Sequence, residues 1–285
     1  MNDLPKLTSP SQVRAWIEAN QFLPSKVLGQ NFLIDGNILR IMVETAAIGP
    51  DDGVLEVGPG LGVLTGPLSE AAARLVAVEK DPRLADHLAA AFRDRPSVTL
   101  VRGDALATDL GALKREHRLT RFVSNLPYSV GSRVLVDCFQ LPDGFERLVV
   151  TVQLEVAERL AARPGTADYG LLAVWAQLDH EARIVKRVAH GCFYPRPQVT
   201  SAIVELVRTR ARRAALPEPV RFDALIKHAF SQRRKQLGTS LASFRHPAAP
   251  GAADAAPRAG IDPTRRPETL AVEEWIALDA ACAAP

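Results

Sequence analysis

The chain has few cysteines, and their spacing could hold neither a metal ion nor a redox disulfide. Its 285 residues include three, Cys138, Cys192 and Cys282, an odd number that lie far apart in the sequence. No two of them form a Cys-x-x-Cys pair, the spacing typical of zinc sites and redox disulfides. We therefore expect reduced, mostly buried thiols and no metal site. The histidines receive no catalytic role, because none adjoins a sequence motif.

Long hydrophobic runs are also absent. No stretch approaches the roughly 18 consecutive apolar residues of a transmembrane helix. The N-terminal segment has acidic and polar residues where a signal peptide needs an apolar core. The sequence therefore predicts no membrane partner and a cytoplasmic location.

The net charge is small, but it is distributed unevenly. The whole chain carries a formal charge of +3, whereas residues 181–245 contain fourteen Lys or Arg and four Asp or Glu. A chain with one acidic and one basic part favours a protein with a face that binds a polyanion. Charge alone leaves open the alternative of a solvated basic surface without a partner.

Short apolar runs alternate with segments of helical length in the first half of the chain. The runs lie at 54–57, 75–78, 98–101 and from 121 onward. Between them, Asp81 and Pro82 are typical of the start of a helix, predicted over 82–92. This alternation predicts βαβ units and a parallel sheet buried on both faces. Further along, we predict a strand at 148–153, a helix at 154–162 and a hairpin of strands at 182–188 and 200–207.

After Arg213 the pattern changes to helix. Helices are predicted at 220–230 and around 270–280, and the Ala/Pro-rich stretch 246–260 indicates a loop or flexible connector. These patterns divide the chain into a helical extension at residues 1–20, an α/β domain at 21–213 and a small helical domain at 214–285.

A glycine-rich loop, Glu56-Val57-Gly58-Pro59-Gly60-Leu61-Gly62, follows the first of these strands and precedes a helix. This is the position of a nucleotide-binding loop. Its third glycine comes one residue early for the dinucleotide fingerprint Gly-x-Gly-x-x-Gly. Glu56 would repel a diphosphate but can pair with the ammonium group of an amino-acid moiety. The loop therefore favours S-adenosylmethionine over NAD.

Two more carboxylates end the next two strands. Glu79 stands about twenty residues after the loop, where a carboxylate can bind both ribose hydroxyls. Asp104 follows the third strand, where it can receive the adenine amino group. The carboxyl ends of parallel strands share one edge of a sheet, so these groups and their neighbours Lys80 and Ala105 are predicted to line one crevice with Glu56. Alternatively, Glu79 and Asp104 are helix caps.

The fourth strand ends in Ser124-Asn125-Leu126-Pro127-Tyr128, which resembles the motif of amino methyltransferases in the form carried by rRNA adenine dimethylases. An adenine amine is a poor nucleophile, because its lone pair is delocalised into the ring. The side-chain oxygen of Asn125 and the carbonyl of Leu126 can accept its two protons and favour a pyramidal nitrogen. Pro127 would stiffen that carbonyl, and Tyr128 would stack on an extruded base. An ordinary turn is the alternative.

The resemblance to the bacterial small-subunit (16S) rRNA adenine dimethyltransferase family extends over nearly the whole chain. Besides the loop and Asn125–Tyr128, the matching segments are 28–33, 193–201 and 230–235. The resemblance implies a seven-stranded class I methyltransferase sheet of the Rossmann-like type with a small helical RNA-binding domain, and S-adenosylmethionine as the cofactor. It further implies dimethylation of two adjacent adenosines in a hairpin near the 3′ end of 16S rRNA within an assembling small subunit. Nothing in the sequence demands a dimer, so we expect a monomer.

The same resemblance assigns further residues. Gln30, Asn31 and Leu33 would lie over the methionine end of the cofactor, with Asn125 close to it, and Phe193 would form a second aromatic face against the adenine. Phe193, which is followed by prolines, could instead be a packing residue. RNA contacts are expected from basic residues of the second half, namely Arg196, Arg208, Arg210, Arg233, Arg234 and Lys235. A solvated basic face is the alternative for residues 233–235.

Two other functions remain open. A large-subunit rRNA adenine methylase of the macrolide-resistance type shares the core and the Asn-Leu-Pro-Tyr motif, and segments 28–33 and 230–235 favour the small-subunit family over it. A non-catalytic nucleic-acid-binding relative, such as the mitochondrial transcription factors that retain this fold, is disfavoured by the intact motif at 125–128.

Overall fold

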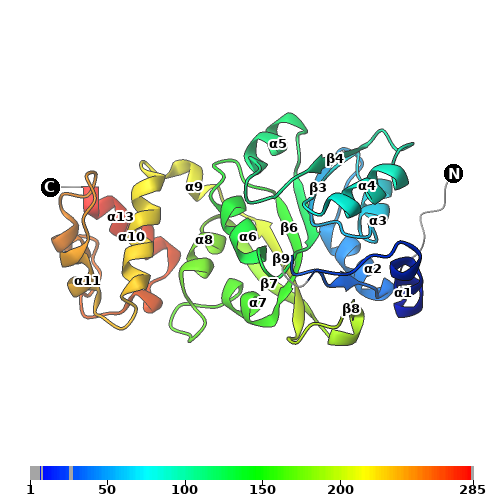
Figure 1. The fold of residues 1–285 in the computed structure, drawn as a ribbon. Helices are drawn as coiled ribbons and strands as arrows, with labels where there is room; N and C mark the ends of the chain where they lie inside the picture. The colour runs from blue at the N-terminus through cyan, green and yellow to red at the C-terminus, as the bar shows by residue number, and fades with distance from the viewer. Residues whose placement is uncertain (1–6, 8, 26–27, 284–285) are drawn as a thin grey trace. The chain divides into compact units, whose positions relative to one another are not determined.

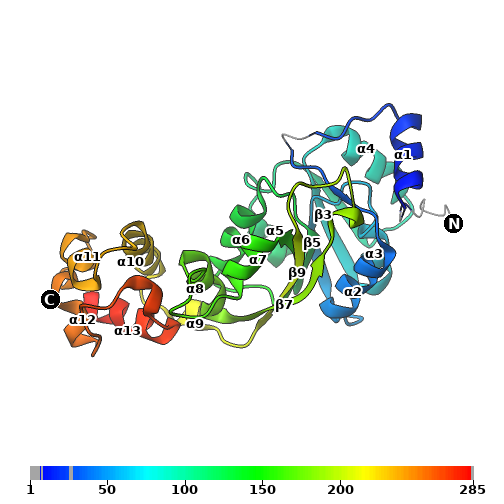
Figure 2. The same cartoon turned by 90° about the horizontal axis from the view of Figure 1, so that it is seen from below.

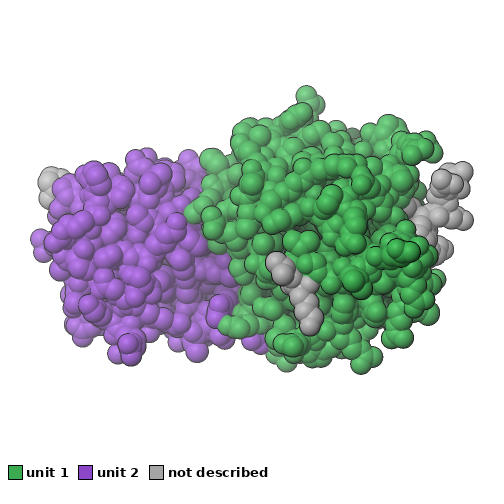
Figure 3. Space-filling model, viewed as in Figure 1, with its two compact units in different colours: residues 1–157, 182–208 green, residues 158–181, 209–285 purple. Residues whose placement is uncertain are grey.

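The computed structural model describes residues 7, 9–25 and 28–283. The chain divides into two compact units, residues 1–157 with 182–208, and residues 158–181 with 209–285 (Figure 3). Residues 158–181 thus group with the C-terminal helices, although the sequence placed them in the α/β domain; the boundary at residue 213 stays a prediction. Of the predicted N-terminal extension, residues 1–6 and 8 lie outside the described residues.

A seven-stranded sheet forms the centre of the first unit (Figure 1). Its strands are β2 (Gly53–Val57), β3 (Arg74–Glu79), β4 (Val98–Arg102), β5 (Arg121–Asn125), β6 (Arg147–Gln153), β7 (His180–Val188) and β9 (Ser201–Arg208). The strand order is β4-β3-β2-β5-β6-β9-β7. The first five strands pair in parallel, and β9 runs antiparallel to β6. The predicted class I sheet is confirmed.

Helices cover both faces of this sheet. The helices of the first unit are α1 (Pro10–Ala19), α2 (Gly36–Ala46), α3 (Thr65–Ala71), α4 (Pro82–Ala91), α5 (Leu110–Glu116), α6 (Gly131–Phe139) and the start of α7 (Leu154–Leu160). Of these, α1 packs in a separate apolar cluster with Phe22, Phe32 and Leu84. Figure 2 shows α2 and α3 on one side of the sheet and α5 and α6 on the other. All five residues of β2 are buried, as expected of a central parallel strand. Asp81 caps α4 as predicted, accepting a hydrogen bond from the backbone N–H of Arg83.

A second, two-stranded sheet connects distant parts of the first unit. Strand β1 (Phe32–Leu33) pairs antiparallel with β8 (Phe193–Tyr194), which follows the 3-10 turn η1 (His190–Cys192). Phe32 lies opposite Tyr194 and Leu33 opposite Phe193. The N-terminal segment is therefore held beside the aromatic residues that follow β7.

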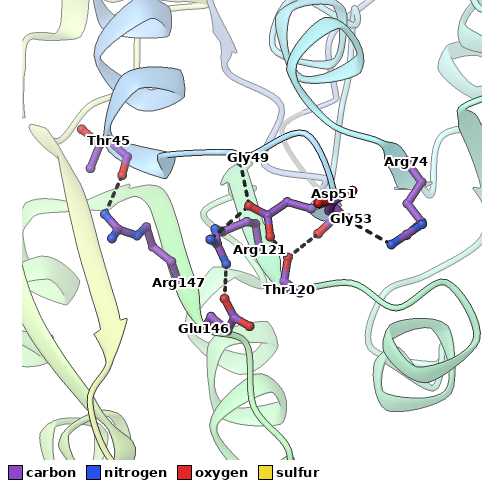
Figure 4. A network of polar contacts seen from close by, with 10 residues as sticks. Thr45, Gly49, Asp51, Gly53, Arg74, Thr120, Arg121, Glu146 and Arg147 are labelled. Carbon is purple, nitrogen blue, oxygen red and sulfur yellow. Dashed lines mark hydrogen bonds and ion pairs between the residues drawn. The ribbon is translucent and has the colours of Figure 1, made fainter.

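A polar network joins the amino ends of the central strands (Figure 4). Arg121, the first residue of β5, contacts Oδ2 of Asp52 at 3.0 Å and Oε2 of Glu146 at 2.6 Å. The hydroxyl of Thr120 and the backbone N–H of Gly49 also donate to Asp52, at 2.6 and 2.8 Å. Burial by itself raises the pKa of Asp52, but these bonds and Arg121 outweigh it and lower that pKa. The network stabilises the edge of the sheet where β2 and β5 begin.

The second unit is helical. Its elements are α8 (Leu171–Asp179), α9 (Arg212–Ala215), α10 (Pro219–Ser231), α11 (Leu237–Ser243), η2 (Ala252–Asp254), α12 (Ala255–Arg258), η3 (Pro267–Thr269) and α13 (Val272–Ala283). Tyr169 and Trp275 are buried among them, and a fully buried ion pair joins Arg221 to Asp279 through two bonds of 2.7 and 2.8 Å. The predicted helices at 220–230 and 270–280 are confirmed within a few residues.

One stretch differs from the expectation. Residues 246–260, predicted to be a loop or flexible connector, contain η2 and α12. Ala252, Ala255 and Ala256 are buried there, because alanine side chains are small enough to let η2 and α12 pack closely against α11 and α13. Composition suggested flexibility where packing produces a compact turn of short helices.

The cysteines are unpaired, with Cys138 and Cys282 buried and Cys192 partly exposed, as predicted. Across the part of the chain that is described, no helix is both long and apolar enough to span a bilayer.

Candidate active site

A pocket of about 1110 Å³, part of it open to solvent, lies at the carboxyl ends of β2, β3 and β5. This is the edge at which open α/β sheets bind ligands. Predicted site residues that line it are Gln30, Asn31, Leu33, Glu56, Gly58, Gly60, Glu79, Lys80, Asp104, Ala105, Asn125, Leu126, Pro127 and Tyr128. Gly62 and Phe193 are not among the lining residues. The structure thus gathers five separate sequence segments around one cavity.

Glu79 holds the glycine loop against β3. Its Oε2 accepts a hydrogen bond of 3.0 Å from the backbone N–H of Gly60, and its Oε1 accepts one of 2.8 Å from that of Asp81. Burial raises the pKa of Glu79, and these two bonds oppose the shift. Glu79 therefore shapes the loop from within the protein, in addition to the ribose contact predicted for it.

The loop glycines are required by turn geometry and packing. Gly58, Gly60 and Gly62 have φ angles of +70°, +60° and +78°, a region that favours glycine. A Cβ on Gly62 would stand 3.0 Å from Cδ2 of Leu88 on α4. Gly62 allows α4 to pack closely against the loop, and the ligand contact predicted for it stays a prediction.

Glu56, the fourth residue of β2, is a buried acid at the pocket. It is 1% exposed, and its Oε2 finds no hydrogen-bond partner among the described residues. Burial raises the pKa of Glu56 to about 8. A buried carboxyl group without a cation favours its neutral form, and an ammonium group beside it would favour the ionised form. The group is therefore suited to a ligand that carries a positive charge.

Asp104 and Lys80 pair at the ends of β4 and β3. Nζ of Lys80 donates to Oδ2 of Asp104 at 2.7 Å, and the backbone N–H of Leu106 donates to Oδ1 at 3.0 Å. The bond from Lys80, followed by that from Leu106, lowers the pKa of Asp104. Asp104 is thus held ionised at the mouth of the pocket, where its oxygens can accept bonds from a ligand.

The N-terminal segment 28–33 lines the pocket and is tied to it by Gln30. Nε2 of Gln30 donates to Oδ2 of Asp81 at 3.0 Å, and its Oε1 accepts from the backbone N–H of Ser25 at 2.7 Å. Asp81 was predicted only as a helix cap. Its two oxygens serve both roles, because Oδ1 caps α4 while Oδ2 holds Gln30.

Asn125 presents a hydrogen-bond acceptor to the pocket. Its Nδ2 donates to the backbone carbonyl of Asn31 at 3.1 Å. Because only the NH₂ group can donate to a carbonyl, this contact sets the orientation of the side-chain amide. Its Oδ1 is buried and has no partner within the described part of the chain. A buried acceptor without a partner is costly, so the site is arranged for a donor from outside the protein.

Tyr128 and Phe193 meet edge to face. Their ring centroids are 6.4 Å apart, and their planes are inclined by 68°. The hydroxyl group of Tyr128 is hydrogen-bonded to Oγ of Ser201, and burial raises the pKa of Tyr128. Phe193 is 1% exposed and contributes to the hydrophobic core. In this arrangement Phe193 supports Tyr128, and its predicted stacking on a base stays a prediction.

Two of the basic residues predicted to contact RNA lie in the first unit. Arg196 is exposed, whereas the guanidinium group of Arg208 is bound to other residues of the protein. The guanidinium of Arg208 contacts Oδ1 of Asp143 at 3.0 Å and the carbonyl of Gly144 at 3.3 Å. Arg208 therefore holds the turn before β6 together, and phosphate contact would require it to leave these partners.

In the second unit, Arg210 lies 3.9 Å from Glu181 in a weak, exposed pair. Arg233 donates to the carbonyl of Ala167 at 2.6 Å and lies 3.8 Å from Oε2 of Glu268. Arg234 and Lys235 are exposed, and neither has an ion pair among the described residues. Their charge is therefore available to a partner, whereas Arg233 holds the loop that contains Ala167.

One residue at the site was not singled out from the sequence. Ser201 ends the matching segment 193–201, where the sequence gave it no role of its own. It is fully buried, and its hydroxyl reaches Tyr128, which lies 73 positions earlier in the chain. No local pattern signals a contact over that separation.

Three features of the fold and the site define a class I methyltransferase. They are the order of the seven strands in the sheet, the glycine loop after β2 and the Asn-Leu-Pro-Tyr turn after β5. A dimethyladenosine transferase from Plasmodium falciparum has a similar fold, with a TM-score of 0.73 and 22% identity over 86% of this chain and 94% of that one. The 23S rRNA methyltransferase ErmE matches with a TM-score of 0.63 and 29% identity, over 88% and 99% of the two chains.

Within the class I methyltransferases, the amino-acid sequence is similar to one family in particular. Residues 22–280 match the profile of the family described as Ribosomal RNA adenine dimethylase. A ribosomal RNA small subunit methyltransferase A of Geobacter metallireducens is 42% identical over 90% of this chain and 94% of its own length. One from Pelotomaculum thermopropionicum is 39% identical over 95% and 96% of the two chains. The chain belongs to the ribosomal RNA adenine dimethylase family.

Proposed function

We propose that this protein uses S-adenosylmethionine to dimethylate the exocyclic amine of two adjacent adenosines in a hairpin near the 3′ end of 16S rRNA. The observation that carries the proposal is the amide of Asn125, whose Oδ1 is buried, oriented by Asn31 and without a partner among the described residues. An amine N–H is the donor that this acceptor lacks. The pocket beside it has the size and polar groups that a nucleoside-type methyl donor needs.

The residues present fit the donor. Glu56 would face the ammonium group of the methionine end, which supplies the cation that its buried carboxyl group lacks. Glu79 would accept the ribose hydroxyls, and Asp104 would accept the adenine amino group. Gln30, Asn31 and Leu33 would cover the methionine end, because they line the pocket from the N-terminal side.

Positioning is the main task of the catalytic residues, because S-adenosylmethionine supplies an already activated sulfonium methyl group. Asn125 Oδ1 and the Leu126 carbonyl would each accept one N–H of the target amine, which aims the nitrogen lone pair at the methyl carbon. The first transfer gives a cationic methylated nitrogen, which releases one proton to solvent and keeps one N–H. One of the two acceptors then suffices to orient the nitrogen for the second transfer. Tyr128 would stack on the extruded base, with Pro127 fixing the turn before it.

The proposed substrate rests on the relatives and on the basic residues. Relatives named for the small ribosomal subunit are 37–42% identical over 86–95% of this chain, whereas the 23S rRNA methyltransferase ErmE is 29% identical. Exposed Arg196, Arg234 and Lys235 supply charge for RNA phosphates. We further propose that the protein acts as a monomer in the cytoplasm, on a small subunit during its assembly.

Methyl transfer with labelled donor tests this function. Wild-type protein should label an immature small subunit at two neighbouring adenosines and leave large-subunit rRNA unlabelled. Asn125→Ala should lower the transfer rate by about 100-fold or more, as the loss of an oriented polar group in a catalytic site does, and retain donor affinity. Asn37→Ala, an exposed asparagine on α2, is the matched control. Labelling of 23S rRNA instead, or an equal loss of donor binding in Asn125→Ala, would contradict the proposal.

A further inference from the structure

The hydroxyl group of Tyr128 is bound at a fixed point of the sheet. Its partner, Oγ of Ser201, belongs to the first residue of β9, which lies opposite Gln153 in the antiparallel pairing with β6. Ser201 is fully buried, with a relative exposure of 0%. Backbone pairing with β6 fixes the position of the Cβ atom of Ser201, and complete burial limits the space in which its hydroxyl group can rotate. The hydroxyl group therefore anchors the far end of the Tyr128 ring.

The ring of Tyr128 has two internal motions, and the structure restrains each with a different contact. The line from Cβ through the ring to the hydroxyl oxygen swings when χ1 changes, and the bond to Ser201 holds its far end. Rotation of the ring about that line is the χ2 motion, which the bond leaves free. Phe193 opposes that rotation, because its ring stands edge to face against Tyr128 at 6.4 Å. Together the two contacts define where the plane of the tyrosine lies.

These contacts also separate tyrosine from phenylalanine at position 128. A phenylalanine would stack on a base equally well, since stacking uses the ring face. It would lose the anchor at the far end of the ring and leave the buried hydroxyl of Ser201 without a partner. Stacking alone therefore does not require the hydroxyl group of Tyr128. Holding the ring in a fixed plane does require it.

We propose that Ser201 is a positioning residue for methyl transfer, which holds the ring of Tyr128 in the plane that receives the target base. This inference rests on the proposed function, in which Tyr128 stacks on the extruded adenine. Ser201 acts through Tyr128 and touches neither the base nor the donor.

A double-mutant cycle tests the inference. Ser201→Ala and Tyr128→Phe each remove the same bond, so each should lower kcat/KM for the RNA by about 3- to 10-fold, the value of one hydrogen bond. The double variant should be no slower than the slower single variant. Donor affinity should stay within about twofold of wild type in all three. The role of Ser201 would be overturned if the fold-losses in kcat/KM of the two single variants multiplied in the double variant, or if both single variants kept the wild-type rate.

A matched control separates positioning from general weakening of the fold. Ser69→Ala removes a buried serine hydroxyl of the same unit, which donates to the carbonyl of Gly66 at 2.7 Å, accepts from Nη1 of Arg95 at 2.9 Å and does not line the pocket. It should lower the unfolding temperature about as much as Ser201→Ala while keeping kcat/KM. An equal loss of activity in Ser69→Ala would assign the effect of Ser201 to stability.

A binding measurement keeps the inference separate from the choice of substrate. An RNA hairpin with 2-aminopurine at the target position reports stacking through quenching of its fluorescence, whether or not a methyl group is transferred. Failure of the wild type to methylate small-subunit rRNA would contradict the proposed function alone. Quenching that is equal in wild type, Ser201→Ala and Tyr128→Phe would overturn the role of Ser201 even if methylation proceeds.

Discussion

Gly58 of the glycine loop lies directly against Pro127 of the Asn-Leu-Pro-Tyr turn. A Cβ on Gly58 would stand 2.9 Å from Cγ and 3.0 Å from Cδ of Pro127, closer than real Cβ contacts allow. The loop that ends β2 and the turn that ends β5 are thus packed together without space between them. A shift of the glycine loop would therefore displace the turn. This contact sets the position of the proposed methyl-donor site relative to the residues proposed to hold the target amine.

Gly58→Ala should therefore impair both functions of the pocket. The added methyl group must push the proline ring away, and the φ angle of +70° is strained for alanine. We expect donor affinity and transfer rate each to fall at least tenfold, measured by calorimetry and by methyl transfer. Gly165→Ala is the control, because Gly165 has a φ angle of +85° but no atom within 4 Å of the added Cβ. It should cost about 1–2 kcal/mol of stability from backbone strain and leave transfer intact.

The raised pKa of Glu56 predicts a pH-dependent stability in the donor-free protein. The pKa rises from 4.5 to about 8 on folding, so the folded state favours the protonated acid. This contribution is fully present below pH 4.5 and is lost as pH rises through 8. Urea unfolding of wild type and Glu56→Gln from pH 5 to 9 should show wild type losing stability relative to the variant, by about 1.4 kcal/mol for each pKa unit at most. If the difference in unfolding free energy between wild type and Glu56→Gln stayed constant over this pH range, Glu56 would not be buried as a neutral acid.

Glu56→Gln should also weaken donor binding. The amide keeps the shape of the side chain but removes the charge that the ammonium group would face. We expect the Kd for S-adenosylmethionine to rise at least tenfold at pH 8, with a smaller effect for an analogue that lacks the amino group. Equal losses for both ligands would place Glu56 away from the amino-acid end.

Arg234 and Lys235 should respond to salt differently from Arg233. The first two are exposed and unpaired within the described residues, so their neutralisation should reduce the log-log salt slope of RNA binding by about 0.7 to 0.9 for each phosphate that is no longer neutralised. Arg233 is held by the carbonyl of Ala167, so Arg233→Ala should mainly loosen that loop and change the slope less. Binding titrations from low to moderate salt measure the slopes. A larger slope change for Arg233→Ala would reverse these roles.

Arg121→Met should lower stability and spare catalysis. Arg121 is 14% exposed in its side chain and joins Asp52 to Glu146 at the end of β5 remote from Asn125. Removing these charge-assisted bonds should cost about 2–3 kcal/mol of unfolding free energy. Arg40→Met, which breaks an exposed pair with Glu44, should cost about 0.5 kcal/mol or less. A drop in kcat at a temperature where Arg121→Met is fully folded would show that the network also reaches the pocket.

Much of the fold was predictable from short-range pattern. Apolar runs separated by helical segments indicated the parallel strands, and Asp81 before Pro82 indicated the start of α4. The stretch 246–260 was misread, because alanine and proline are common in flexible segments and its burial depends on α11 and α13. Helix α8 was not predicted, since its sequence is apolar around most of its circumference and has no clear helical period.

The amino-acid sequence by itself identified segments that the structure gathers around one pocket: the loop at 56–62, the carboxylates Glu79 and Asp104, and the turn at 125–128. Their spacing relative to strands places them at one edge of a sheet, because all parallel strands end on the same side. Tertiary structure alone decided how they cooperate. The contacts of Asn31 with Asn125, Gln30 with Asp81 and Ser201 with Tyr128 span 94, 51 and 73 residues. Such contacts depend on the packing of β1 and β9 against distant parts of the chain. The local preference of a segment for helix or strand contains no information about that packing.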